Sequence, residues 1–282
     1  MATQNAAAVG GISHQEYMEF CNFLETSCGI VLGENKQYLV NSRLKQLIKD
    51  HGLDSLSSLV AILKAGSNPK LRDHTIDAMT TNETSWFRDN YPYEALKSVI
   101  VPSLLKQGKR QIRIWSSASS SGQEPYSIAI ILDELQRQQL ANKFEVEILA
   151  TDISPTMLND ARKGVFDTIS IARGLSPERK QRYFTNVDGG YWKINEDLKK
   201  KIAFKEANLL SSFNMHGKFD VIFCRNVLIY FAVPIKQDII NRMVQCLNPG
   251  GYLFLGGTES VINYTDRFES IRHLNGIIYQ LK

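Results

Sequence analysis

The sequence has few of the features that define several common protein classes. No run of about 18 consecutive apolar residues occurs, so no membrane-spanning helix is expected. Four cysteines in 282 residues are too few and too scattered for a disulfide framework or a zinc site, so we expect reduced thiols and no metal. Residues 1–11 have neither the basic start nor the apolar run of a signal peptide. These absences favour a cytoplasmic protein.

The sequence also has no large excess of positive or negative charge. Lys and Arg total 33 against 29 Asp and Glu, and the resulting net charge of +4 is too weak to indicate nucleic-acid binding. Hydrophobic residues make up 43% and charged residues 22% of the chain, which is typical of globular proteins and excludes global disorder. The length predicts two folded units.

The N-terminal third shows helical periodicity. After residues 1–12, which we expect to be a disordered tail, Ser13 and Glu16 have the spacing of a capping box, and Gly29 offers a stop for the first helix. Short loops separate the helices, which favours a small all-α bundle over residues 13–80. The expected helices lie at about 13–29, 36–51, 55–66 and 69–79.

The second of these helices is basic. Its cations are Lys36, Arg43, Lys45 and Lys49, with no acidic residue among them. Because the charges flank and oppose the apolar stripe, they are more typical of a solvated helix face than of a cluster. A docking surface for an acidic partner is the alternative.

The remainder of the chain alternates strands and helices. This pattern predicts a doubly wound α/β sheet that binds its ligand at the carboxyl ends of parallel strands. Residues 164–201 break the alternation, and we expect a small antiparallel β insertion with Phe184 and Trp192 on two strands joined by a turn at 188–190. The strands of the main sheet are expected at 112–115, 146–150, near 202–204, 219–224, 252–255 and 277–281. The helices are expected at about 124–139, from 155 onward, and at 234–247.

Small residues fill the loop after the first strand of the main sheet. Residues 116–122 would let a ligand approach the backbone closely, although a plain turn fits them as well. The loop lacks G-x-G-x-x-G, which disfavours a dinucleotide. Glu124, at the start of the next helix, favours an amine or a hydroxyl group over a phosphate.

Polar residues follow the other strands. Asp152 ends the second strand, where an acid accepts hydrogen bonds from both ribose hydroxyls. The alternative is that Asp152 caps the helix opening at Pro155, a role that Ser154 could fill instead. Asn208 and Leu209 could place a polar group and an apolar wall around an adenine.

Arg225 and Asn226 form an unusual pair that leaves a buried strand. A desolvated guanidinium needs a partner, so a structural ion pair is the alternative to ligand binding here. Tyr230 follows a turn later and is either a core residue or a residue at the mouth of the ligand cleft. The segment 80–88 is crowded with side-chain donors, as in a ligand site or an ordinary polar linker.

Four segments, in their order and spacing, resemble the chemotaxis receptor glutamate O-methyltransferases, the CheR family. They are Thr80–Arg88, Ser116–Ser127, Thr151–Ile153 and Phe223–Phe231. The resemblance runs from about residue 13 to the end of the chain. It implies a helical receptor-docking domain (13–80), a linker with cofactor contacts (81–90) and an S-adenosylmethionine-dependent methyltransferase domain (91–282) that carries the β-subdomain insertion.

The resemblance also implies roles for residues and partners. Arg88 and Tyr230 would lie closest to the transferred methyl group. The basic helix would contact the cytoplasmic methylation helices of chemoreceptors, and in some members the β-subdomain holds a peptide from the receptor C-terminus. We expect a monomer that binds no nucleic acid and does not insert into membranes. The implied cofactor contacts are Asn82, Thr84, Arg88, Glu124, Asp152, Asn208, Leu209, Arg225 and Asn226.

The implied reaction transfers a methyl group from S-adenosylmethionine to glutamate carboxylates, giving glutamate 5-O-methyl esters and S-adenosylhomocysteine. A carboxylate with a pKa of about 4.3 is ionised at neutral pH, so the reaction needs no general base. Three alternatives stay open: a methyltransferase of another substrate such as RNA or a small molecule, a non-catalytic cofactor-sensing scaffold, and a nicotinamide-dependent oxidoreductase. The missing glycine motif disfavours the last of these.

Overall fold

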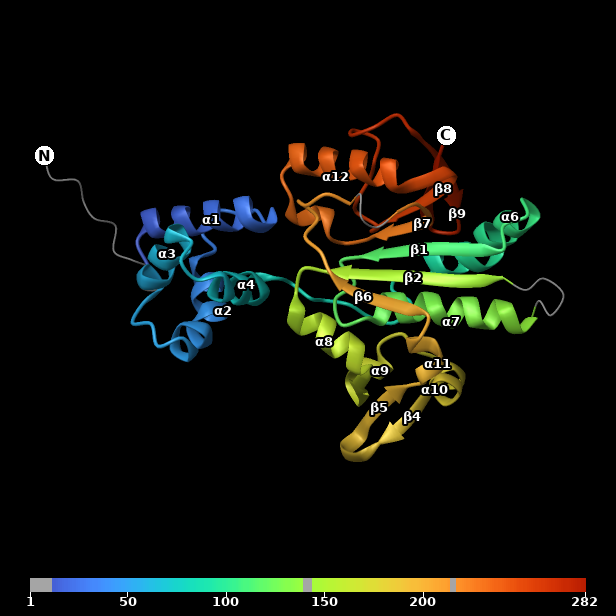
Figure 1. Ribbon diagram of the computed structural model, residues 1–282, viewed down its shortest axis with the longest axis horizontal. Coiled ribbons are helices and arrows are strands. Elements are labelled where there is room, and N and C mark those ends of the chain that lie inside the picture. Colours follow the sequence, from blue (N-terminus) through green and yellow to red (C-terminus); the bar gives the residue numbers. More distant parts are fainter. Residues whose placement is uncertain (1–11, 139–143, 214–216) are drawn as a thin grey trace, which may run out of the picture. The chain divides into compact units, whose positions relative to one another are not determined.

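The computed structural model describes residues 12–138, 144–213 and 217–282. The chain divides into a helical unit, Met1–Thr81 with Tyr230–Ile235, and a sheet unit, Asn82–Ile229 with Lys236–Lys282 (Figure 1). Most of the expected N-terminal tail lies outside the described residues, while Ile12 is buried.

The helical unit contains the four expected helices, and three of them begin at a residue whose side chain caps the helix. Ser13 and Glu16 form both hydrogen bonds of a capping box, and Gly29 ends the first helix in the left-handed conformation. Ser55 caps the third helix, since its hydroxyl oxygen accepts from Ser58 N–H. The helices are α1 (His14–Cys28), α2 (Gln37–Asp50), α3 (Leu56–Ala65) and α4 (Pro69–Met79).

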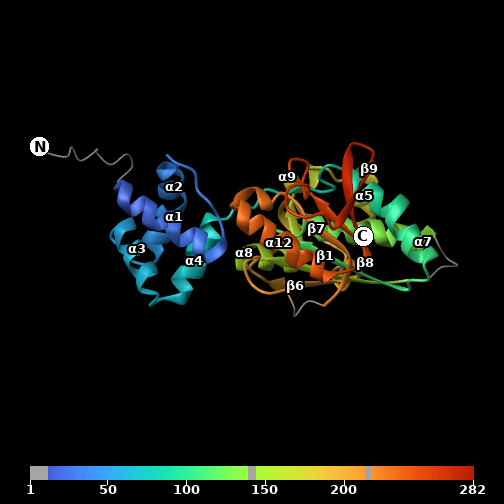
Figure 2. The same ribbon diagram turned by 90° about the horizontal axis from the view of Figure 1, so that it is seen from above.

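The sheet unit is built on a seven-stranded sheet in the order β6-β2-β1-β7-β8-β10-β9. Figures 1 and 2 show β1 beside β7 at the middle of this sheet, where the strand order reverses. Neighbouring strands are parallel except that β10 runs antiparallel to β8 and β9. The strands are β1 (Gln111–Ser117), β2 (Glu145–Asp152), β6 (Ile202–Glu206), β7 (Phe219–Cys224), β8 (Leu247–Leu255), β9 (Phe268–His273) and β10 (Gly276–Leu281).

Helices link these parallel strands. From β1 the chain passes to β2 and then to β6 on one side of the sheet, and from β7 it passes to β8 on the other side. Right-handed crossovers in these two directions place the connecting helices on opposite faces, as in a doubly wound fold. The predicted fold class is therefore confirmed. The helices are α5 (Tyr91–Ala95), η1 (Leu96–Ile100), α6 (Val101–Lys106), α7 (Gln123–Gln138), α8 (Pro155–Lys163) and α12 (Val233–Cys246), with a short turn η4 (Leu228–Tyr230).

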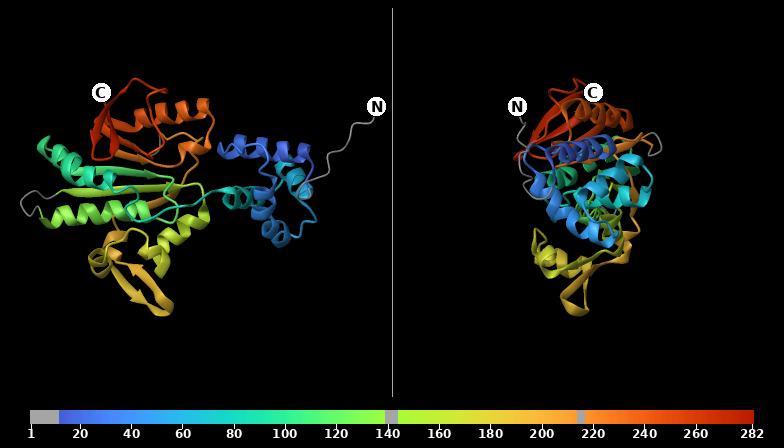
Figure 3. Two further views of the ribbon diagram at one scale, coloured as in Figure 1. Left: turned by 180° about the vertical axis from the view of Figure 1, so that it is seen from behind. Right: turned by 90° about the vertical axis from the view of Figure 1, so that its left-hand side faces the viewer.

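The insertion forms a small antiparallel sheet in the order β3-β5-β4. It lies beside α7 and α8 in Figures 1 and 3. The predicted strands through Phe184 and Trp192 and the turn between them are confirmed, and a third, unpredicted strand pairs with them. The elements are β3 (Val165–Asp167), α9 (Thr168–Ala172), α10 (Pro177–Tyr183), β4 (Phe184–Val187), η2 (Asp188–Gly190), β5 (Tyr191–Ile194) and α11 (Glu196–Lys199).

Two features of the main sheet differ from the sequence prediction. Strand β9 was not predicted, because it is an edge strand in which Phe268 alone is buried, so its apolar signal is weak. The segment 248–251, expected as a loop, belongs to an early, irregular part of β8. Gly251 fits there because a Cβ would lie 2.8 Å from the Asn248 carbonyl oxygen.

Candidate active site

The loops that follow β1, β2, β7 and β8 make direct contacts at the carboxyl edge of the sheet. The backbone N–H of Ser120 donates to Asp152, which joins the first two loops. Arg225 donates to Glu124, which joins the loop after β7 to α7. The edge lies where the strand order reverses, the usual ligand position in doubly wound folds.

The loop after β1 holds three residues in the left-handed backbone region. Ala118, Ser120 and Gly122 have φ values of 57°, 50° and 95°. For the two residues with side chains this conformation costs energy, and such strain often marks ligand-binding sites. At Gly122 an added Cβ would lie 3.0 Å from the Cβ of Ala161, so the strained loop packs closely on α8.

Asp152 is held by backbone groups of two loops. Its Oδ2 accepts a 2.7 Å hydrogen bond from Ser120 N–H, and its Oδ1 accepts a 2.9 Å bond from Ser154 N–H. Ser154 caps α8 itself, because its hydroxyl oxygen accepts from Met157 N–H at 3.0 Å. The helix-cap alternative for Asp152 is therefore wrong, and its buried carboxylate is fixed at the edge of the sheet.

Arg225 lies at the centre of a charged network. Its side chain is 1% exposed, and its two Nη atoms donate to Glu124 Oε2 at 3.1 Å and to Asp89 Oδ2 at 2.5 Å. Nη2 also donates to the Arg88 carbonyl oxygen. The structural ion pair, which the sequence left as the alternative to ligand binding at Arg225, is therefore present, and it ties the linker to α7. Burial raises the pKa of Glu124, although the positive charge of Arg225 and a hydrogen bond from Ser116 oppose the rise.

Asn226 adopts the left-handed conformation, with φ of 57°. Its backbone N–H donates to Glu259 Oε2 at 2.7 Å. Within residues 12–138, 144–213 and 217–282, the buried Oδ1 of Asn226 has no hydrogen-bond partner, and neither does the buried hydroxyl of Ser119. Other buried side-chain atoms, such as Trp86 Nε1 and the Tyr93 hydroxyl, lack a partner there too, but the oxygens of Asn226 and Ser119 lie in loops at the carboxyl edge, where a ligand can supply the partner.

The segment 82–90 is anchored through Trp86 to the insertion. The Trp86 ring packs edge-on against Phe166 and Phe184, at centroid distances of 4.9 and 5.2 Å. Its backbone N–H donates to the Arg173 carbonyl oxygen at 3.0 Å. The Trp86 carbonyl oxygen leaves no room for a side chain at residue 174, since a Cβ on Gly174 would lie 2.1 Å from it.

The predicted contacts in this segment lie around that anchor. The Asn82 carbonyl oxygen accepts a 3.0 Å hydrogen bond from the Ser120 hydroxyl, so Asn82 lies beside the loop after β1. Thr84 and Arg88 are half-buried, and Arg88 Nη1 donates to the Glu83 carbonyl oxygen. The structure thus brings this segment and the loop after β1 together.

Asn208 and Leu209 follow β6, the neighbour of β2. Asn208 Oδ1 accepts from Leu210 N–H at 2.9 Å, and Leu209 is buried. The Leu209 carbonyl oxygen accepts from Arg242 of α12. The loop joins the site because the Asp152 carbonyl oxygen accepts from Ala207 N–H at 2.9 Å.

Tyr230 groups with the helical unit, in which its carbonyl oxygen accepts from Val31 N–H at 2.9 Å. The place of Tyr230 near the transferred methyl group stays a prediction.

The basic residues of α2 differ from one another. Lys36, Lys45 and Lys49 are exposed. Arg43 is half-buried, and its guanidinium donates to the carbonyl oxygens of Met79 and Thr80 at 2.6 and 2.8 Å. Arg43 therefore caps the end of α4, a role that its sequence pattern did not predict.

Two site residues were not predicted. Asp89 pairs with Arg225, and Glu259 holds Asn226. Asp89 is adjacent to a predicted contact, and Glu259 follows Gly256 and Gly257 after a buried strand. The sequence signal that could have identified Glu259 is an acidic residue in a glycine-rich turn after a buried strand.

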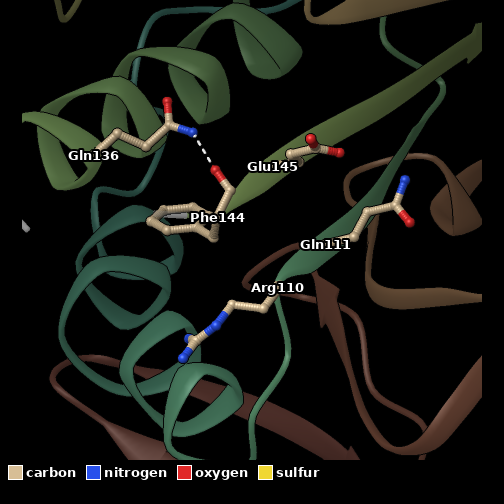
Figure 4. A pocket seen from close by; sticks show the side chains of 5 residues that line it. All are labelled: Arg110, Gln111, Gln136, Phe144 and Glu145. Atoms are coloured by element: carbon tan, nitrogen blue, oxygen red, sulfur yellow. Dashed lines mark hydrogen bonds between the residues drawn. The ribbon is translucent and has the colours of Figure 1, made fainter. Parts of the chain in front are cut away.

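A pocket at the opposite, amino edge of the sheet lies between the starts of β1 and β2 (Figure 4). Gln136 of α7 donates to the Phe144 carbonyl oxygen there at 2.8 Å. It contains none of the predicted site residues, and the charged groups of the candidate site lie at the other ends of the same strands.

The donor and acceptor set at the carboxyl edge fits S-adenosylmethionine. The carboxylate of Glu124 suits an ammonium group, and that of Asp152 suits ribose hydroxyls. Asn226 Oδ1 and Ser119 Oγ are buried and have no hydrogen-bond partner among the described residues. In the described part of the chain, no group of three or more His, Cys, Asp or Glu could hold a metal ion. No described helix is long and apolar enough to cross a membrane.

Comparison with known proteins identifies the family of this chain. Residues 15–80 match the CheR methyltransferase all-alpha domain, and residues 82–277 match the CheR methyltransferase SAM binding domain. The chemotaxis protein methyltransferases of Vibrio parahaemolyticus and Vibrio cholerae are 51% and 50% identical over 271 residues, 96% of this chain and 98% of each relative. Chemotaxis protein methyltransferase Cher2 of Pseudomonas putida is 48% identical over 95% of this chain and 98% of its own length. This S-adenosylmethionine-binding chain therefore belongs to the CheR methyltransferase family.

Proposed function

We propose that the chain methylates glutamate side-chain carboxylates of chemotaxis receptors, giving 5-O-methyl esters in sensory adaptation. The observation that carries the proposal is the identity of about half of all residues with chemotaxis protein methyltransferases over nearly the whole chain. The choice of receptor glutamates as methyl acceptors is supported by the family resemblance.

The sheet unit supplies the cofactor site in this proposal. S-adenosylmethionine, when bound, supplies a methyl group on a cationic sulfur. Asp152 accepts hydrogen bonds from the ribose, and Glu124 accepts from the ammonium group of the amino-acid part. Asn208 and Leu209 border the adenine. The linker contacts Asn82, Thr84 and Arg88 and the pair Arg225 and Asn226 complete the proposed site.

The proposed reaction depends on the orientation of the acceptor oxygen and the methyl group and needs no proton transfer. The acceptor glutamate is ionised at neutral pH, so its oxygen attacks as an anion and no side chain has to remove a proton. Because an anion and a cation neutralise each other in this step, a dry site lowers the barrier. Arg88 and Tyr230 are proposed to position the acceptor and the methyl group, a contribution that comes from orientation.

The helical unit, residues 13–80, is proposed to dock on the receptor. Exposed Lys36, Lys45 and Lys49 would meet the acidic cytoplasmic methylation helices, with Arg43 as the fourth predicted docking residue. The insertion at 164–201 would hold a C-terminal receptor peptide where the receptor carries one. We propose that the protein acts as a monomer in the cytoplasm.

A methyl-acceptor assay tests this proposal. The full chain is incubated with labelled S-adenosylmethionine and either receptor-containing membranes or RNA, and the product is mapped by mass spectrometry. Methyl esters on receptor glutamates are the expected product. Label on RNA, or cofactor binding without label on any receptor, would refute it.

The Tyr230→Phe variant tests the positioning role within the same assay. We expect a fall in receptor methylation of about tenfold, since one hydroxyl hydrogen bond is lost, with unchanged affinity for S-adenosylhomocysteine. Tyr264→Phe is the matched control, and it should keep full activity. Full activity of Tyr230→Phe would remove this residue from the mechanism.

A further inference from the structure

We propose that Glu259 is a positioning residue that holds the loop after β7 in the shape needed for cofactor binding. The loop after β8 carries Glu259, and the loop after β7 carries Arg225 and Asn226. This inference rests on the proposed function, in which Asn226 contacts the cofactor. It adds a residue outside the four segments by which the chain resembles its family.

The Glu259 carboxylate gathers three backbone donors. Its Oε2 accepts from Asn226 N–H and from Gly256 N–H, each at 2.7 Å, and its Oε1 accepts from Ile229 N–H at 3.2 Å. Two of these donors lie in the loop after β7, about 30 residues earlier in the chain. One side chain thus fixes both ends of the segment 226–229, and hydrogen bonds to an ionised acceptor are stronger than neutral ones.

The backbone around Glu259 is shaped for this contact. A Cβ at Gly256 would lie 2.6 Å from Asn226 Nδ2 and 2.7 Å from Glu259 Oε2, so a side chain at this position would displace one of these two groups. The Glu259 N–H donates to the Gly256 carbonyl oxygen at 2.9 Å, which closes the turn. The backbone at Gly256 therefore packs against the side chains of Asn226 and Glu259.

The contact also explains the conformation of Asn226. Its φ of 57° lies in the left-handed region, which asparagine adopts more readily than most residues with a side chain, and the hydrogen bond to Glu259 helps to hold it there. In the part of the chain that the structure describes, its Oδ1 is buried and has no hydrogen-bond partner, as expected of an acceptor kept for a ligand. Glu259 bonds the backbone of Asn226 and leaves that amide oxygen available.

The Glu259→Gln variant tests the inference. Glutamine keeps the size, but its amide group cannot accept from all three N–H donors, so the loop loses part of its support. We expect the affinity for S-adenosylhomocysteine, measured by calorimetric titration, to fall about tenfold, the effect of one charged hydrogen bond. The binding stoichiometry should stay at one, because the molecules remain folded. Glu269→Gln, the same change on the exposed edge strand β9, should leave the affinity unchanged.

A double-mutant cycle separates positioning from a general loss of stability. Gly256→Ala disturbs the same contact from the other side, so its effect on affinity should not add to that of Glu259→Gln. Additive effects, or a Glu259→Gln variant that binds with unchanged affinity, would overturn the inference. So would a variant whose stoichiometry falls while its affinity stays normal, since that result reports unfolded protein.

The Asn226→Ala variant distinguishes this inference from the proposed function. If Asn226→Ala binds S-adenosylhomocysteine weakly and Glu259→Gln binds it normally, the positioning role is wrong and the proposed cofactor contact stands. If Asn226→Ala binds normally, the proposed contact at Asn226 is wrong and the inference falls with it. Weak binding by both variants supports both statements.

Discussion

Both edges of the main sheet bury carboxylates, but the surroundings of these carboxylates differ in whether every buried oxygen has a hydrogen-bond partner. At the amino edge, Asp220 is 2% exposed, and its oxygens accept from Lys109 Nζ at 2.5 Å, Asn248 Nδ2 at 2.8 Å and Arg113 N–H at 3.0 Å. At the carboxyl edge, the network around Glu124 lies beside buried oxygens of Asn226 and Ser119 that find no partner among the described residues.

Carboxylates at both edges accept from protein donors, and among the described residues the carboxyl edge also has buried acceptors that are left for a ligand. Removing a buried charge that protein donors surround destabilises the fold, because its partners are left unsatisfied. A buried acceptor without a protein partner costs free energy in the unliganded protein, and a ligand that supplies the donor recovers it. The predictions below test this distinction at particular residues.

The largest expected effect belongs to Asp152→Ala. We expect the affinity for S-adenosylhomocysteine to fall at least about 100-fold, because two hydrogen bonds from ribose hydroxyls to a charged acceptor would be lost. Calorimetric titration measures this change. An unchanged affinity would refute the ribose role of Asp152 and with it the ligand assignment of the carboxyl edge.

The matched change at the other edge is Asp220→Ala. We expect the free energy of unfolding to fall by about 3 kcal/mol, since the three groups that donate to Asp220 lose their acceptor. Urea denaturation measures the loss, and the cofactor affinity of the folded protein should remain normal. A large loss of affinity with little loss of stability would contradict the comparison.

A pH titration of cofactor binding sharpens the role of Glu124. Burial raises the pKa of this carboxyl group, so it becomes protonated at a higher pH than an ordinary glutamate as the pH falls. We expect the affinity for S-adenosylhomocysteine to decrease as the pH is lowered from 7 towards 5. In Glu124→Gln the affinity at pH 7 should be about tenfold weaker and its pH dependence flatter. Equal pH profiles for the two proteins would argue against a Glu124 contact with the ligand ammonium.

The same distinction extends to helix α2, with the smallest expected effect. Replacing exposed Lys45 and Lys49 by alanine should raise KM for receptor membranes roughly fivefold at low salt, because each surface charge contributes little and is screened. Arg43→Ala should instead lower the melting temperature, because the guanidinium caps α4. If Arg43→Ala alone raised KM and left stability unchanged, its structural role would be wrong.

Much of the fold was predictable because local signals mark it. The bounds of α4 at Pro69–Met79 and of β7 at Phe219–Cys224 agree with the sequence prediction. Proline in the first turn of α4 and the continuous apolar run of β7 are strong local signals. Strand β3 was missed because three residues carry too little periodicity to detect.

The candidate site was predictable to a smaller extent. Asp152 and Arg225 were predicted from their positions at strand ends, Glu124 from its position at the start of a helix, and all three from the family resemblance. Asp89 and Glu259 were missed because each acts through a partner far along the chain, and Arg43 was assigned to a surface although its guanidinium bonds internally. No local pattern reports such a partner.

The sequence by itself determined the helix ends, the alternation of strands with helices and the polar residues at the strand ends, because capping, periodicity and chain order are local properties. Only the tertiary structure decided which charges meet. Arg225 pairs with Glu124 and Asp89 across 101 and 136 residues of chain. These groups come together because parallel pairing of β1 with β7 brings the ends of distant strands to one edge, and that pairing depends on the whole sheet.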